Sequence, residues 1–101
     1  MTTYLRKIAE EIRAYVPPDA VPGGDDTLLF DVYAVLALAC GSSTTSEDVH
    51  NAWVAWMTNH DADHDSLVPF EDLGSETAAA DLPFLRAIQA WAGRQAIVAE
   101  L

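Results

Sequence analysis

The feature that most constrains this fold is an apolar run from Leu28 to Cys40, which only Asp31 interrupts. The run has about 13 residues, whereas a helix needs about 20 to cross a bilayer. A segment rich in proline, glycine and aspartate precedes it over residues 17–26, and Gly41 follows it. Because glycine readily adopts the left-handed conformation that ends helices, the pattern predicts one separate helix. We expect this helix to be central and nearly free of solvent.

Apolar side chains at steps of three and four residues predict helices on either side of this run. Before Pro17, such a stripe runs through residues 2–16 and consists of Leu5, Ile8, Ile12 and Tyr15. After the run, Thr44 and Glu47 have the spacing of a capping box and open a further helix. The face of this helix that we expect in the core is Val49, Ala52, Trp53, Trp56 and Met57.

We predict that a last helix begins at Asp81 or Leu82, because proline is favoured in the first turn of a helix and Pro83 follows them. Its expected core face is Leu85, Ile88, Trp91 or Ala92, and Ala96. No segment alternates polar and apolar residues as strands do. We therefore predict an all-α protein with a single domain over residues 1–101. It should be a compact bundle of four main helices with an extended Leu-Val-Pro loop, residues 67–69, packed on its core.

Charge is distributed unevenly along the chain. The sequence has 16 acidic and 5 basic residues, a formal net charge of -11, and no basic residue between Ala14 and Leu85. Contacts to phosphates need lysine or arginine, so direct binding to nucleic acid or to an anionic membrane is disfavoured. An anionic surface favours a protein partner with a basic surface instead. The single cysteine, Cys40, cannot form an intramolecular disulfide, so we expect a buried thiol and a cytoplasmic location.

One acidic segment has part of the pattern of a calcium loop. Ser66 replaces the glycine usual in such loops, and Pro69 occupies the ninth position. The alternatives are a zinc or nickel site that uses His60 and His64, and a solvated acidic loop without metal. No local motif joins a nucleophile to a base, so we expect no enzymatic activity and no cofactor. The carboxylates at the first, third, fifth and twelfth positions of the calcium pattern are Asp61, Asp63, Asp65 and Asp72.

Three segments in the second half of the chain resemble the ryanodine-receptor repeat. They are residues 47–53 (EDVHNAW), 64–73 (HDSLVPFEDL) and 81–88 (DLPFLRAI). That family has a His-x-x-Trp helix, a His-Pro-x-Leu-Val-Pro-Tyr-x-x-Leu loop and an acidic residue ahead of a closing helix. The similarity covers residues 47–92, with Asp65 in place of proline and Phe70 in place of tyrosine. The chain also resembles small uncharacterised proteins of actinobacteria and their phages.

The resemblance implies a non-enzymatic helical module for protein contacts, and prokaryotic members have been proposed to recognise nucleotide-derived small molecules. We therefore expect an accessory protein of a phage or an actinobacterium that binds a basic protein partner through its anionic surface. The alternatives are a small-molecule-binding module and a DNA mimic that inhibits a host enzyme. An indole on an apolar surface patch would also permit a homodimer. The positions that match the family's motif, and that would form a ligand pocket, are His50, Trp53, His64 and Phe70.

Overall fold

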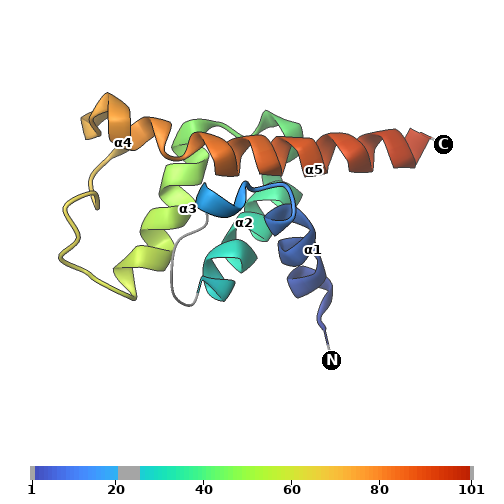
Figure 1. Ribbon diagram of the computed structural model, residues 1–101, viewed down its shortest axis with the longest axis horizontal. Helices are drawn as coiled ribbons and strands as arrows, with labels where there is room; N and C mark the ends of the chain where they lie inside the picture. Colours follow the sequence, from blue (N-terminus) through green and yellow to red (C-terminus); the bar gives the residue numbers. More distant parts are fainter. Residues whose placement is uncertain (1, 21–25, 101) are drawn as a thin grey trace.

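The computed structural model describes residues 2–20 and 26–100, with side chains as far as Gln95, and throughout these ranges the regular structure is helical. No strand occurs in them, so the prediction of an all-α bundle with four main helices is confirmed (Figure 1). No helix in the described ranges has the length and apolar content needed to span a membrane. The long helices are α1 (Tyr4–Arg13), α2 (Thr27–Cys40), α3 (Ser46–Thr58) and α5 (Leu82–Glu100); the short elements are η1 (Pro18–Ala20), η2 (Gly41–Ser43), η3 (Phe70–Asp72) and α4 (Ser75–Ala79).

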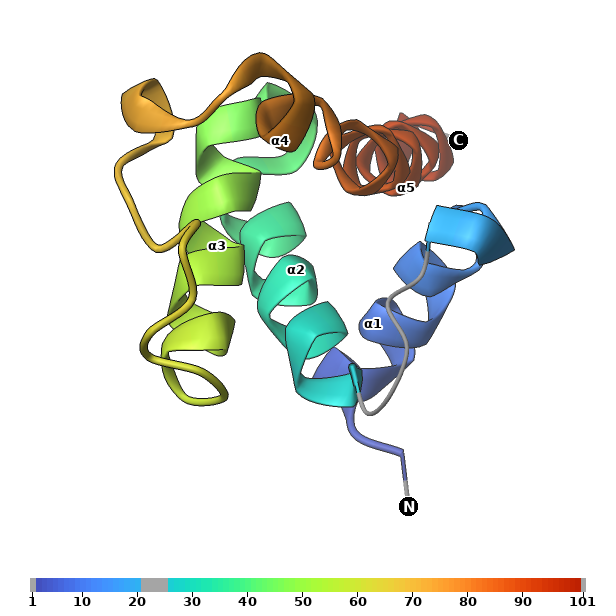
Figure 2. The same cartoon turned by 60° about the vertical axis from the view of Figure 1, so that its left-hand side comes forward.

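Helix α2 is the central element and contacts α1, α3 and α5. Figure 2 shows α1, α2 and α3 next to one another, and Figure 1 shows α5 running lengthwise across their upper ends. Apolar stripes from all four helices meet in one core, and removal of this apolar surface from water stabilises the fold. The largest side chains that are almost fully buried there are Tyr33, Ile12, Leu29, Ile88 and Val49. Ala96, which we expected on the core face of α5, lies outside the described side chains.

The expectation that α2 is nearly free of solvent is wrong for one of its faces. Leu28, Val35 and Leu38 are 59%, 52% and 46% exposed. Leu29, by contrast, is 1% exposed. The reason is that the three neighbouring helices cover only part of the circumference of α2, and a small chain has too few elements to cover the rest. Cys40, at the end of the same helix, is half-buried and not fully buried as expected.

Local hydrogen bonds set the junction between α2 and α3. Gly41 has a φ of 56°, so the chain leaves α2 through the left-handed region that glycine allows, as predicted. Thr45 caps α3, because its hydroxyl accepts a hydrogen bond from the Asp48 N–H at 3.2 Å and the Asp48 carboxylate accepts one from the Thr45 N–H at 2.9 Å. Thr44 instead donates its hydroxyl to the Gly41 carbonyl at 2.6 Å. The capping box predicted at Thr44 and Glu47 is therefore one residue further along.

Ion pairs join α1 to the start of α2. Arg6 donates two hydrogen bonds to the carboxylate of Asp31, at 2.9 and 2.7 Å. Arg13 pairs with Asp26, which directly precedes α2. The Asp26 carboxylate makes no hydrogen bond to the helix end.

Candidate ligand-binding pocket

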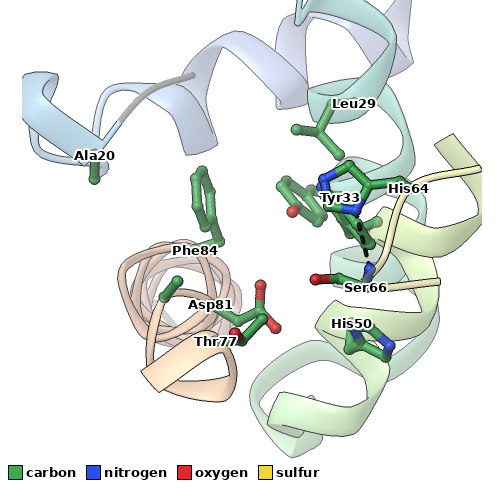
Figure 3. Close-up of a pocket in the computed structure, with 11 residues that line it drawn as sticks. Ala20, Leu29, Tyr33, His50, His64, Ser66, Thr77, Asp81 and Phe84 are labelled. Carbon is green, nitrogen blue, oxygen red and sulfur yellow. Dashed lines mark hydrogen bonds between the residues drawn. The ribbon is translucent and has the colours of Figure 1, made fainter. Parts of the chain in front are cut away.

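A pocket of about 270 Å³ lies where α2, α3, the start of α5 and the chain after α3 meet (Figure 3). Its walls are mostly apolar, and a few polar groups from different elements reach it. Small ligands generally bind in apolar clefts of this kind. Helix α2 contributes Leu29 and Tyr33, α3 contributes His50 and Trp53, the segment after α3 contributes His64 and Ser66, and the corner between α4 and α5 contributes Thr77, Asp81 and Phe84.

His50 connects α3 by a hydrogen bond to the chain segment of residues 59–69, here called the 59–69 loop. The imidazole is 2% exposed, and its Nε2 atom lies 2.7 Å from the carbonyl oxygen of Val68. Because a carbonyl oxygen only accepts hydrogen bonds, Nε2 carries the proton and donates. The same ring stacks on Trp53 with centroids 5.8 Å apart and lies 6.2 Å from the ring of Phe70. One buried side chain thus holds both the backbone of the loop and the turn that follows it.

A second contact holds the middle of the 59–69 loop over the pocket. The His64 ring lies edge-on to Trp53, with centroids 5.0 Å apart. The Ser66 backbone N–H donates a hydrogen bond to Nδ1 of His64 at 3.0 Å, so this nitrogen carries no proton in the structure. The loop therefore forms one wall of the pocket, and Trp53 forms part of another.

The structure brings together three of the four residues that the family resemblance suggested. His50, Trp53 and His64 line the pocket, whereas Phe70 is not among the lining residues and contacts His50 instead. The Leu-Val-Pro segment is attached to α3 through Val68, and the side chains of Leu67, Val68 and Phe70 are half-buried.

The residues of the possible metal site are not gathered in this way. In the described part of the chain, no group of three or more histidine, cysteine, aspartate or glutamate side chains could hold a metal ion. The Oδ1 atom of Asp61 accepts a hydrogen bond from the backbone N–H of Asp63 at 3.2 Å, which is a local turn. His60 is exposed and donates through Nδ1 to the carbonyl oxygen of Trp56 at 2.9 Å. The four acidic positions, all exposed, are Asp61, Asp63, Asp65 and Asp72.

Two pocket residues, Tyr33 and Asp81, were missed as site residues by the sequence analysis. Burial raises the pKa of the Tyr33 phenol, and the negative charge of Asp81 raises it further. Burial also raises the pKa of the Asp81 carboxyl, while the positive charge of protonated His50 opposes this effect. The sequence predicts Asp81 as the start of the last helix and as the acidic residue that the family has ahead of its closing helix, but not as a residue of the pocket. The available signal was its position as a lone charge in an apolar segment, between Ala80 and Leu82.

Comparison of the sequence with protein-family models gives a match over most of the chain. The model of a domain of unknown function, DUF7701, matches residues 3–93. The chain belongs to the DUF7701 family. No curated protein and no solved structure matches it. The DUF7701 match includes α1, α2, α3, α4 and α5 as far as Gly93, so every residue that lines the pocket lies inside the family domain.

Proposed function

We propose that this DUF7701 domain is a non-enzymatic module that binds a small molecule in the pocket between α2, α3 and α5. The observation that supports the proposal is the meeting of unpaired polar groups in an apolar cavity. Within the described residues, neither the Tyr33 hydroxyl nor the Asp81 carboxylate makes a hydrogen bond or an ion pair. Polar groups that have no protein partner in an apolar cavity remain available to a bound molecule, and such an arrangement is typical of ligand sites.

The dimensions and charge of the pocket limit the ligand. A volume of about 270 Å³ equals the space of roughly nine water molecules at about 30 Å³ each, so a molecule of about that many non-hydrogen atoms fills it. A complete nucleotide is larger than this. The sequence also has no lysine or arginine between Ala14 and Leu85 that could pair with a phosphate in the pocket. The proposed ligand therefore carries no phosphate, and the part of it that enters the pocket is smaller than a complete nucleotide.

Trp53 and Trp56 provide the experiment that tests this function. Trp53 lines the pocket, whereas Trp56, three residues along α3, lines a different groove on the outer side of α2 and α3. A library of small metabolites is screened by thermal shift, where a ligand at ten times its Kd should raise the free energy of unfolding by about 1.4 kcal/mol. We expect each true ligand to change the tryptophan emission of the wild type and of Trp56→Phe, but not of Trp53→Phe. A library without a single stabilising compound, or hits that need Trp56 and not Trp53, would contradict the proposal.

A second candidate function is contact with a basic protein partner. The exposed apolar face of α2 supports it, because a groove of about 490 Å³ follows this face and is lined by Leu28, Val32, Val35 and Trp56. Contiguous apolar patches often mark protein contacts, and the net charge of -11 would attract a basic partner. The same two variants separate the candidates, since a partner in this groove should alter Trp56 emission and leave Trp53 unchanged. DNA mimicry and a phage origin remain predictions from the sequence.

A further inference from the structure

The carboxylate of Asp81 is the polar group of the pocket that most restricts what can bind there. It lies between the side of α5 that carries Phe84 and the side of the loop that carries Ser66 (Figure 3). In the described part of the chain, it has no ion-pair or hydrogen-bond partner. A ligand that supplies a positive charge or a strong donor at this point would satisfy it, whereas a ligand anion would be repelled.

Aromatic side chains line the same pocket as this carboxylate. Tyr33 and Phe84 are in contact, with ring centroids 5.4 Å apart, and both line the pocket. Trp53 lines it from α3. The face of an aromatic ring attracts a cation electrostatically, and the attraction is stronger where water is excluded. A pocket that contains a carboxylate and is lined by several rings is therefore suited to an organic cation.

The net negative charge of the molecule also favours a cationic ligand. The chain has a formal net charge of -11, so cations are concentrated near its surface and anions are depleted. A metal ion is a poorer match than an organic cation, because the described residues contain no group of three metal-ligating side chains.

We propose that the ligand of this pocket carries an organic ammonium group, which pairs with Asp81 among the rings of Tyr33, Trp53 and Phe84. This inference rests on the proposed small-molecule function and names the class of the ligand. The ammonium group can belong to a free amine or to a lysine side chain of a protein, and the experiment below separates these two sources.

Burial of Asp81 also predicts how the stability of the protein depends on pH, and this prediction can be measured without any ligand. Burial raises the pKa of this carboxyl, so the folded protein holds its proton more tightly than the unfolded chain does. The stability from this group is complete below the ordinary pKa of 3.8 and is lost as the pH rises through the folded pKa. Asp81→Asn removes that loss, so the variant should be more stable than the wild type at pH 7, and the difference should vanish in acid. The other titratable groups that line the pocket are Tyr33 of α2, His50 of α3 and His64 of the 59–69 loop.

The test compares three probes of one shape and different charge: 2-phenylethylamine, 2-phenylethanol and phenylacetate. Binding is followed at pH 7 through Trp53 emission and amide chemical shifts. For a ligand of this size we expect the amine to bind with a Kd on the order of 1 mM and the other two probes about tenfold or more weakly. Asp81→Asn should weaken the amine about tenfold. Asp72→Asn, which removes an exposed carboxylate outside the pocket and outside the 59–69 loop, should leave its Kd within about twofold.

Each outcome decides the inference. Equal binding of the alcohol, tighter binding of phenylacetate, or an Asp81→Asn variant that binds the amine normally would overturn the ammonium assignment and leave the small-molecule function standing. Failure of all three probes would overturn it too, and the metabolite screen would then decide the wider proposal. A fourth probe, Nα-acetyl-lysine N-methylamide, assigns the source. Tighter binding than the free amine indicates a lysine of a protein partner, and weaker binding indicates a free amine.

Discussion

Replacing Leu29 with alanine is expected to lower the free energy of unfolding by about 2 to 5 kcal/mol, a large part of the stability of a domain of this size. Leu29 is 1% exposed and belongs to the core cluster that α2 forms with its neighbours. The substitution removes buried apolar groups and leaves a cavity that the surrounding helices fill only in part. Urea denaturation followed by circular dichroism measures the change.

Leu28→Ala is the matched control for this prediction. It makes the same substitution one residue earlier in α2, at a side chain that is 59% exposed. We expect its effect to stay within about 0.5 kcal/mol, as for most surface substitutions. If Leu28→Ala cost as much as Leu29→Ala, the outer face of α2 would be covered in solution, and its description as an exposed apolar surface would be wrong.

Replacing His50 with alanine is expected to release the 59–69 loop from α3 and to lower the free energy of unfolding by about 2 to 3 kcal/mol. The variant loses the hydrogen bond from Nε2 to the Val68 carbonyl and the stack on Trp53. The amides of Ser66 and Leu67 report the loop directly, because they donate to His64 Nδ1 and to the His64 carbonyl at 3.0 and 3.1 Å. We expect their hydrogen exchange to accelerate about tenfold or more, together with loss of ligand binding.

His60→Ala provides the comparison for the His50 variant. His60 also donates to a backbone carbonyl, that of Trp56, but it is exposed and does not line the pocket. Its removal should change the free energy of unfolding by less than about 1 kcal/mol and leave exchange at Ser66 and Leu67 unchanged. Equal effects of the two variants would mean that His50 has no special part in holding the loop.

The helices of this fold could be predicted from the sequence because their signals are local. The four-residue spacing of Ile8 and Ile12, or of Val49 and Trp53, indicates a helical stripe that faces the core, and each of these side chains packs in or against the core. Gly41 ends α2 as expected. The capping box is displaced by one residue because Thr44 and Thr45 both have suitable side chains, and only the geometry of the turn selects between them.

The exposed face of α2 and the composition of the pocket could not be predicted in the same way. A helix that is apolar on all sides does not indicate how many neighbouring helices will cover it. In this structure three helices contact α2, and they leave Leu28 and Val35 exposed. Tyr33 and Asp81 are 48 positions apart in the sequence and meet only when α5 packs across α2. His50 and Trp53 were found from a short motif, since both lie on one helix.

The most direct test of the central claim, that the pocket between α2, α3 and α5 binds an organic ammonium group, is a map of chemical shifts during titration with 2-phenylethylamine. We expect saturable shifts that share one Kd at Ser66, Thr77 and the Trp53 indole, and no change at Val35 or Ala55 in the outer groove. Shifts centred on Val35 and Ala55 would contradict the claim, as would changes that never saturate.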